Sequence, residues 1–225
     1  MLPADGRRKK LLIADMDSTI ITIECIDELA DFMGLKAEIA AVTERAMRGE
    51  LDFEQALTER VAKLKGLTVE KLQQAYDERV RLTPGAATLV RTMRANGAVT
   101  ALVSGGFTFF TQRVARAVGF EHVYGNTLEI ADGALTGRVV PPILGANAKL
   151  SELQSLIKQN GLNTEETLAI GDGANDIPMI EAAGLGLAFH AKPKTAAAAR
   201  AEIRHGDLTT ALFYQGYAES DFVTA

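Results

Sequence analysis

Four short apolar segments, separated by helical patterns, place the strongest constraint on the fold of this chain. The apolar segments lie at residues 9–15, 98–103, 167–170 and 185–189. Helical periodicity fills the stretches at residues 86–96, 107–118, 149–160 and 174–183. Buried strands that alternate with helices form right-handed β-α-β units. The sequence therefore predicts an α/β fold, with an open parallel, Rossmann-like sheet that carries helices on both faces.

Two stretches interrupt this alternation. Residues 24–79 contain several helical patterns and no convincing strand, which predicts a small helical cap inserted after the first strand. Residues 126–140 alternate with period two around Asp132-Gly133, which predicts a small β-hairpin. Pro84-Gly85 marks the return to the α/β pattern. We therefore expect an α/β core of residues 1–22 and 85–225 and a cap of residues 23–84.

Composition and charge exclude several classes of protein. The hydrophobic content of 47% and the charged content of 24% are ordinary for a globular protein. A formal net charge of −5 argues against a nucleic-acid-binding surface, although residues 7–10 form a basic cluster that we interpret as a solvated leader. The single cysteine, Cys25, excludes an internal disulfide and fits a reducing compartment. Neither a membrane span nor a signal-peptide pattern is evident, so the expected location is the cytoplasm.

Polar and glycine residues follow three of the four apolar segments. Asp15 and Asp17 follow the first, Ser104-Gly105-Gly106 follows the second, and the stretch 171–176 follows the third. In an open α/β sheet the binding crevice lies beyond the carboxyl ends of the strands. These three loops are therefore expected to converge on one crevice.

The acids in these loops suit a hard cation. If the extended conformation continues past Asp15, period two places the Asp15 and Asp17 carboxylates on the same side of the chain. Two carboxylates at that distance repel unless a cation or proton lies between them. Asp172 and Asp176 add two more acids. An all-oxygen donor set without cysteine or histidine favours Mg²⁺.

The remaining pieces fit a phosphate group. Ser104 offers a hydroxyl, while Gly105 and Gly106 allow backbone N–H groups to approach a ligand at the start of a helix. Lys149 opens the next helix and offers a point charge for a phosphoryl oxygen. Each piece alone has an ordinary explanation, as a turn, a surface pair or a solvated lysine. Their combined order along the chain favours a phosphate site.

The same residues resemble the four motifs of the haloacid dehalogenase superfamily. The motifs are DMDST at 15–19, Ser104-Gly105, Lys149 and GDGAND at 171–176. A narrower resemblance links this chain to the branch of that superfamily that hydrolyses O-phosphoserine. It rests on the segments at residues 24–30, 46–67, 128–140, 188–194 and 205–217.

The resemblance implies a role for each acid. Asp15 would be the nucleophile that forms an aspartyl-phosphate, and it would also bind Mg²⁺. Asp17 would protonate the leaving oxygen and later deprotonate water, while its backbone carbonyl would bind the metal. Asp172 would be a metal ligand, and Asp176 would support the metal ligands without binding the metal itself.

The resemblance also implies the substrate contacts. The phosphoryl group would be held by Ser104, Gly105, Gly106, Lys149 and Asn175. Glu24 would meet the substrate ammonium and Arg60 its carboxylate, with Met47 and Phe53 lining the pocket. Without the resemblance, Arg60 would be a surface residue, Glu24 a helix-entry residue, and Met47 and Phe53 plain cap core.

The implied activity is Mg²⁺-dependent hydrolysis of O-phospho-L-serine to serine and phosphate, the last step of serine biosynthesis. A related phosphomonoesterase, or a phosphotransferase that passes the phosphoryl group to homoserine, is an alternative within the same class. A phospho-accepting signalling module is an alternative from another class, although Asp17 and the inserted cap count against it. The expected partner is a small-molecule substrate, with no nucleic acid and no membrane, and the chain is expected to be a monomer or a homodimer.

Overall fold

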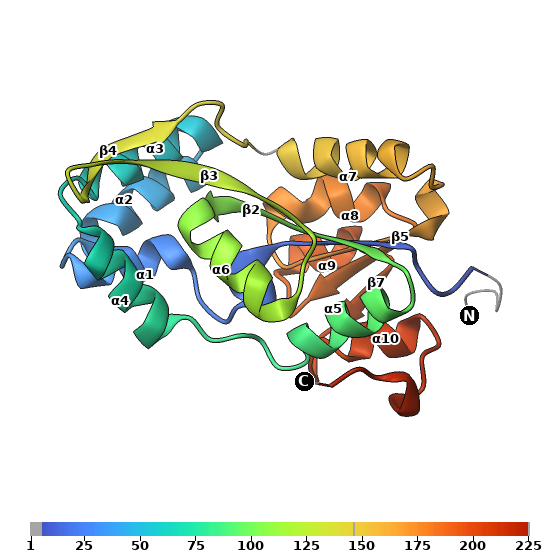
Figure 1. Ribbon diagram of the computed structural model, residues 1–225. Helices are drawn as coiled ribbons and strands as arrows, with labels where there is room; N and C mark the ends of the chain where they lie inside the picture. The colour runs from blue at the N-terminus through green and yellow to red at the C-terminus, as the bar shows by residue number, and fades with distance from the viewer. Residues whose placement is uncertain (1–5, 146, 225) are drawn as a thin grey trace.

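The computed structural model describes residues 6–145 and 147–224 (Figure 1). Its strands form a seven-stranded sheet in the order β4-β3-β2-β1-β5-β6-β7. Neighbouring strands are parallel, except that β3 and β4 are antiparallel. The strands are β1 (Leu11–Ala14), β2 (Val99–Phe107), β3 (His122–Ala131), β4 (Ala134–Val140), β5 (Thr167–Gly171), β6 (Leu185–Phe189) and β7 (Ala201–Ile203). The predicted α/β fold with an open, mostly parallel sheet is confirmed.

Helices cover both faces of this sheet because its central strands are apolar on both sides. Alternate residues of β1 pack in opposite directions: Leu12 faces one core cluster, and Leu11 faces the other. The first cluster includes residues of α5 (Ala86–Ala95), α6 (Thr108–Val118) and α10 (Thr210–Tyr214). The second includes residues of α7 (Ala148–Gln159) and α8 (Ile177–Ala182). Figure 1 shows these two groups of helices on opposite sides of the strands.

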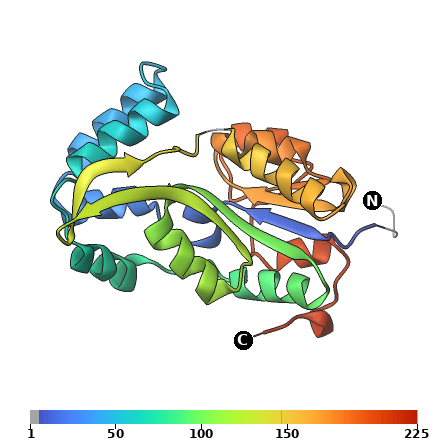
Figure 2. The ribbon, with the colours of Figure 1, turned by 45° about the horizontal axis from the view of Figure 1, so that its top comes forward.

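Four helices lie between β1 and α5 in the sequence, and they form the predicted helical insert. They are α1 (Cys25–Phe32), α2 (Lys36–Met47), α3 (Phe53–Lys63) and α4 (Val69–Arg79). Helix α3 starts with a capping box in which Asp52 and Gln55 satisfy each other's backbone N–H groups. Figures 1 and 2 show the insert at one end of the sheet, away from α5 and α10.

The two chain segments that connect the insert to the sheet run side by side. Ile21 pairs with Leu82 in an isolated antiparallel bridge, and Thr83 N–H donates to the Ile20 carbonyl at 2.9 Å. The domain boundaries proposed from the sequence fall close to this pairing. Residues 1–5, 146 and 225, which the proposed core includes, lie outside the described residues.

The β3–β4 hairpin is longer than the sequence pattern predicts, and it belongs to the main sheet. The first half of β3 pairs with β2, and the second half pairs with β4. The hairpin then reaches the insert: Gly66 N–H donates to the Leu135 carbonyl at 2.8 Å, and Leu135 N–H donates to the Leu67 carbonyl at 2.8 Å. The hairpin therefore connects the sheet with the loop between α3 and α4.

The alanine-rich stretch at residues 196–199, which the sequence suggests is helical, overlaps the short helix α9 (Pro193–Ala198) after β6. Strand β7 and helix α10, which come next, lie outside the predicted pattern. The segment predicted as a helix at 174–183 divides into a 3₁₀ turn at Ala174–Asp176 and helix α8. Among the described helices, none combines the length and the apolar character that a membrane crossing needs.

Candidate active site

Three adjacent strands place their carboxyl ends at one edge of the sheet. β1 lies between β2 and β5, and the three are parallel, so Asp15, Ser104 and Asp172 come together. A cavity of about 490 Å³ opens there, between the sheet and the helical insert. It is lined by most of the site residues predicted from the sequence: Asp15, Asp17, Glu24, Met47, Phe53, Arg60, Ser104, Gly105, Gly106, Asp172 and Asn175.

The extended conformation of β1 does not continue unbroken to Asp17, because Met16, between the two acids, has helical backbone angles. Asp15 (φ −70°, ψ 161°) and Asp17 (φ −66°, ψ 137°) both have extended backbone angles, and both side chains line the cavity. Ser18 has φ 55°, in the left-handed region, and Ile21 N–H donates to the Met16 carbonyl at 3.0 Å. This tight turn sends the chain from β1 into the insert directly after Asp17.

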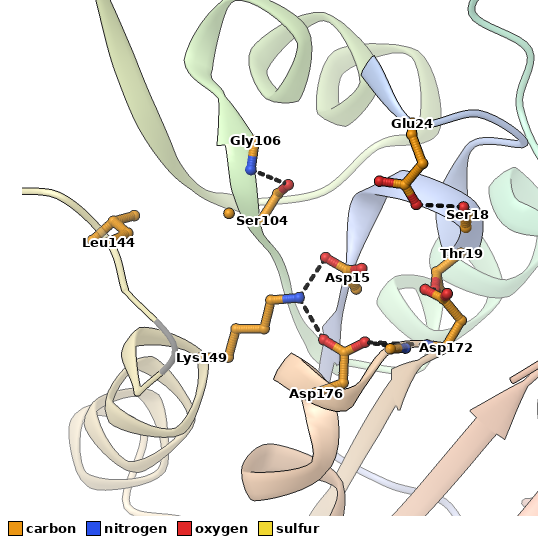
Figure 3. A network of polar contacts seen from close by, with 12 residues as sticks. Asp15, Ser18, Thr19, Glu24, Ser104, Gly106, Leu144, Lys149, Asp172 and Asp176 are labelled. Atoms are coloured by element: carbon orange, nitrogen blue, oxygen red, sulfur yellow. Dashed lines mark hydrogen bonds and ion pairs between the residues drawn. The ribbon is translucent and has the colours of Figure 1, made fainter. Parts of the chain in front are cut away.

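Lys149 and three carboxylates form the charged centre of the site (Figure 3). Lys149, Asp15 and Asp176 are buried, and Asp172 is half-buried. The Lys149 ammonium lies 2.5 Å from Asp15 Oδ1 and also forms an ion pair with Asp176. Carboxylate oxygens of Asp15, Asp172 and Asp176 all lie within 4.8 Å of one another. Thr19 Oγ1 donates a hydrogen bond to Asp172 Oδ1 at 3.1 Å. Asp17 stands outside this group of three carboxylates, and the resemblance assigns only its backbone carbonyl to the metal.

Asp176 organises the loop that follows β5. Its Oδ2 atom accepts the backbone N–H of Asp172 at 3.1 Å and of Gly173 at 2.9 Å, while Oδ1 faces Lys149. A Cβ atom at Gly171 would lie 2.4 Å from the Asp176 carboxyl carbon, so only glycine fits there. Asp176 therefore holds both the loop and the lysine.

Burial and mutual repulsion set the pKa values of these acids. Burial, together with the charge of Asp176, raises the pKa of Asp15 well above its ordinary value, although Lys149 opposes the shift. The pKa of Asp172 is raised to about 6 by burial and then by Asp176. Burial followed by repulsion from Glu24 raises the pKa of Asp17 to about 7. Burial disfavours the Lys149 ammonium, but Asp15 and Asp176 outweigh it and raise its pKa.

This donor set fits a hard divalent cation. Asp15, Asp172 and Asp176 offer only oxygen atoms, and no histidine or thiol belongs to the cluster. Burial is the largest cause of the raised pKa values of Asp15 and Asp172, and the negative charge of Asp176 adds to it at both. A divalent cation among these oxygens would relieve this repulsion. We conclude that this part of the site suits a divalent metal ion.

Residues 104–106, which we call the phosphate loop, lie near the carboxyl end of β2 and have the open backbone expected of a phosphate-binding segment. Ser104 Oγ accepts the Gly106 N–H at 2.8 Å (Figure 3). A Cβ atom at Gly106 would lie 2.9 Å from Asp17 Oδ2 and 3.0 Å from Ser104 Oγ. The absence of side chains at Gly105 and Gly106 therefore leaves the backbone accessible from the cavity.

The insert contributes the opposite wall of the cavity. Phe53 packs on the phosphate loop, since a Cβ atom at Gly105 would lie only 3.0 Å from Phe53 Cζ. Ser18 Oγ donates to Glu24 Oε1 at 2.6 Å. Burial lowers the pKa of Arg60, an effect that Asp27 and Glu24 oppose. Met47 lines the cavity but is 82% exposed, because it ends α2 at the rim.

Two residues that support this site were not predicted. Thr19 directs the Asp172 carboxylate through its hydroxyl group, and Asp27 lines the cavity and acts electrostatically on Arg60. Asp27 lies three residues after Glu24 on a helical pattern, so a shared helix face was the available signal. The contact of Thr19 with Asp172 joins positions 153 residues apart and leaves no local signal.

Comparisons with known proteins agree with this arrangement. The family model of haloacid dehalogenase-like hydrolases matches residues 12–181. A phosphoserine phosphatase of Polaromonas sp. is 47% identical over 204 residues, which cover 88% of this chain and 86% of the relative. A phosphoserine phosphatase of Archaeoglobus fulgidus is 48% identical over 187 residues, which cover 83% of this chain but 54% of the relative.

Solved structures show the same similarity. A phospho-aspartyl intermediate analogue of phosphoserine phosphatase superimposes with a TM-score of 0.84 at 41% identity, covering 92% of this chain and 99% of that one. A substrate-bound phosphoserine phosphatase complex also gives a TM-score of 0.84 at 41% identity, with 92% and 98% coverage. The chain therefore belongs to the haloacid dehalogenase-like hydrolase family, in the group that contains the phosphoserine phosphatases.

Proposed function

We propose that this protein hydrolyses O-phospho-L-serine to serine and phosphate, with Mg²⁺ as cofactor and an aspartyl-phosphate on Asp15 as intermediate. One observation carries the proposal. The Asp15 carboxylate, held by Lys149, faces a cavity whose other walls are the Ser104–Gly106 loop and an insert that carries Glu24 and Arg60. The relatives named above bear this activity in their names.

In the first step, an Asp15 oxygen attacks phosphorus and the bond between phosphorus and the serine oxygen breaks. Asp17 delivers its proton to that oxygen, so serine leaves as a neutral alcohol. The raised pKa of Asp17, about 7, keeps a proton available on this carboxyl group near neutral pH. Lys149 holds the attacking carboxylate in position.

In the second step, Asp17 accepts a proton from a water molecule whose oxygen attacks phosphorus. The bond between phosphorus and Asp15 breaks, which releases phosphate and restores the Asp15 carboxylate. At the end of the cycle Asp17 is protonated again, and Asp15 is again an ionised carboxylate. The insert covers the cavity and limits the access of bulk water to the intermediate.

The phosphoryl group would be bound by Ser104 Oγ, by the backbone of Gly105 and Gly106, by Lys149 and by Asn175. Asp15, Asp172 and the backbone carbonyl of Asp17 would hold Mg²⁺, with Asp176 supporting them. When bound, Mg²⁺ supplies positive charge that offsets the charge on the phosphoryl oxygens. These contacts would position the phosphoryl group for attack by Asp15 and offset the negative charge on its oxygens in the transition state.

The insert would select the serine part of the substrate. The planar Arg60 guanidinium suits two parallel hydrogen bonds to the substrate carboxylate, and Glu24 suits the ammonium group. Met47 and Phe53 would line the rest of the pocket. The negative charges of Asp27 and Glu24 oppose the effect of burial on the pKa of Arg60 and so favour its charged form.

A phosphomonoester panel assayed with Mg²⁺ tests the proposal. The panel contains O-phospho-L-serine, O-phospho-D-serine, phosphothreonine and an aryl phosphate, each with and without homoserine. We expect O-phospho-L-serine to have the highest kcat/KM and serine plus phosphate to be the products. Phosphohomoserine as the main product would replace hydrolysis by phosphoryl transfer. A stable phosphorylated protein without turnover would identify a phospho-accepting module instead.

Two expectations from the sequence stay predictions. The cytoplasmic location rests on the single cysteine, Cys25, which fits a reducing compartment. The oligomeric state, monomer or homodimer, is measured by light scattering of the purified chain.

A further inference from the structure

Asn126 is a buried polar residue beside the phosphate loop, and no catalytic role has been assigned to it. It lies on β3, and its exposed fraction is 1%. Burying an amide side chain costs free energy unless both its donor and its acceptor atoms are used. The contacts of Asn126 therefore show what the side chain stabilises.

The strand pairing next to Asn126 is irregular. Val103 pairs with Tyr124 and Phe107 pairs with Asn126, so residues 104–106 lie opposite the single residue Gly125. The phosphate loop is thus a bulge in β2, and extra residues in a bulge lose their ladder partners. A Cβ atom at Gly125 would lie 3.3 Å from the Gly106 carbonyl oxygen, so β3 approaches the bulge closely.

The Asn126 side chain replaces a hydrogen bond that the bulge removes. Its Nδ2 atom donates to the Gly105 carbonyl at 2.9 Å. A buried carbonyl without a partner would favour rearrangement of the loop. The amide therefore stabilises the conformation in which Gly105 and Gly106 face the cavity.

The same amide also holds the segment that leads to Lys149. Asn126 Oδ1 accepts the Leu144 N–H at 2.8 Å, and Nδ2 lies 3.4 Å from the Leu144 carbonyl oxygen. Leu144 lies a few residues before α7, whose first turn carries Lys149 (Figure 3). One side chain thus connects two of the segments that would hold the phosphoryl group.

We propose that Asn126 is a positioning residue for phosphate binding, which keeps the Ser104–Gly106 loop and the segment before Lys149 at a constant separation. This role rests on the proposed phosphatase function. Asn126 acts through the Gly105 carbonyl and the Leu144 backbone, and it touches neither the phosphoryl group nor the reacting atoms. Loss of the amide should therefore weaken phosphate binding more than it weakens binding of the serine part, which the insert contacts.

Both hydrogen-bonding atoms of the amide are needed, so an isosteric substitution tests the role. Asn126→Asp keeps the shape but places a carboxylate oxygen against the Gly105 and Leu144 carbonyl oxygens. Asn126→Ala removes both contacts without adding charge.

Gln215 provides a matched control far from the site. Its exposed fraction is also 1%, and its amide likewise joins separate backbone segments. Oε1 accepts the Lys9 N–H at 3.0 Å, and Nε2 donates to the Ala211 carbonyl at 3.1 Å. Gln215→Glu therefore also replaces a buried, hydrogen-bonded amide by a carboxylate, but at a position that does not contact the phosphate loop.

The experiment measures inhibition constants of inorganic phosphate and of L-serine, with Mg²⁺ present, for the wild type, Asn126→Asp, Asn126→Ala and Gln215→Glu. Thermal midpoints are measured for all four proteins. For the Asn126 variants we expect the phosphate constant to rise about tenfold and the serine constant to change by less than about twofold. For Gln215→Glu we expect a lower thermal midpoint and both constants within about twofold of the wild type.

Equal losses for phosphate and serine, or unchanged phosphate binding in folded Asn126 variants, would overturn the positioning role. If the wild type neither binds phosphate nor hydrolyses phosphoserine, the proposed function fails and this role fails with it. If both Asn126 variants unfold, NMR of the wild type decides. Added phosphate should shift the Asn126 side-chain amide signal but not that of Gln215, and an unmoved Asn126 signal overturns the proposal.

Discussion

At the scale of single residues, Asp15 and Asp17 are distinguished by their neighbours. Asp15 is paired with the Lys149 ammonium, which aligns one of its oxygens. The Asp17 carboxylate instead accepts the Cys25 backbone N–H at 3.2 Å and a hydrogen bond from the Cys25 thiol. Burial raises the pKa of both acids, but Lys149 counteracts the rise at Asp15, whereas repulsion from Glu24 adds to it at Asp17. One acid is therefore suited to attack, and the other is suited to carry a proton.

Asp15→Asn tests the nucleophile. The amide is a poor nucleophile, so we expect kcat on phosphoserine to fall by more than about 10⁴-fold. The thermal midpoint should stay constant or rise, because the change removes one of three crowded carboxylates. Retention of about a tenth of the wild-type rate would exclude Asp15 from this role.

Arg60→Ala tests substrate recognition. We expect kcat/KM on phosphoserine to fall about 100-fold, because a paired contact to the substrate carboxylate is lost. Turnover of an aryl phosphate, which has no such carboxylate, should change by less than about threefold. Arg45→Ala is the control, since Arg45 also lies on a cap helix but pairs with Glu59 at 2.7 Å outside the cavity. Equal losses on both substrates would assign Arg60 to the fold or to the phosphate site.

Membership of the site was predictable from the sequence for residues whose motif lies at the end of a strand. Asp15, Ser104 and Asp172 each lie at or within two residues of the end of an apolar segment, so their meeting follows from parallel strands. The partners of Asn126 were not predictable. Its contacts depend on a bulge in another strand and on Leu144, and neither leaves a mark in the local sequence around position 126.

At the scale of elements, the β3–β4 hairpin links the sheet to the insert. Gly137 on β4 has φ 84°, and a Cβ atom there would lie 3.0 Å from Lys65 Cβ and 3.2 Å from the Ala62 carbonyl oxygen. Ala62 lies on the last turn of α3, which also carries Arg60, and Lys65 lies just beyond the end of that helix. The hairpin therefore limits where α3 can lie above the cavity.

Gly137→Ala tests this link. The added methyl group should displace the end of α3 and raise KM for phosphoserine about fivefold, with little change for an aryl phosphate. Gly133→Ala is a matched control, because Gly133 has a similar φ of 77° in the same hairpin and open space at its Cβ position. If both variants behave alike, backbone strain rather than contact with α3 explains the effect.

The elements differ in how well the sequence predicts them. Buried parallel strands and amphipathic helices are predictable because their apolar spacing is local. The extent of β3 is not, because its first half pairs with β2 and its side chains are only partly buried. Strand β7 has three residues, too few to show a period, and it is defined by its pairing with β6.

At the scale of the whole molecule, the crowded carboxylates couple stability to pH and to metal. The pKa values of Asp17 and Asp172 in the folded protein, about 7 and about 6, lie above the unfolded value. The folded chain therefore retains protons that the unfolded chain releases, so stability falls as pH rises toward these values. Metal binding requires the ionised forms and acts in the opposite direction.

Thermal unfolding across this pH range measures the coupling. With a chelator present, we expect the thermal midpoint of unfolding to fall by about 5 °C between about pH 5 and pH 8. With excess Mg²⁺ the fall should shrink or reverse. Asp172→Asn should flatten the curve recorded in chelator, because it removes one of the crowded charges. A flat wild-type curve in chelator would contradict the raised pKa values of Asp17 and Asp172.

The central claim is that three strand ends bring Asp15 and its counter-charges to one phosphoryl group. Acid quenching of the protein during turnover of radiolabelled phosphoserine with Mg²⁺ tests it most directly. We predict a phosphoryl label on the peptide that contains Asp15, lost on a chase at the rate of phosphate release and absent from Asp15→Asn. Steady release of phosphate with no label on that peptide, or with equal label in Asp15→Asn, would contradict the claim.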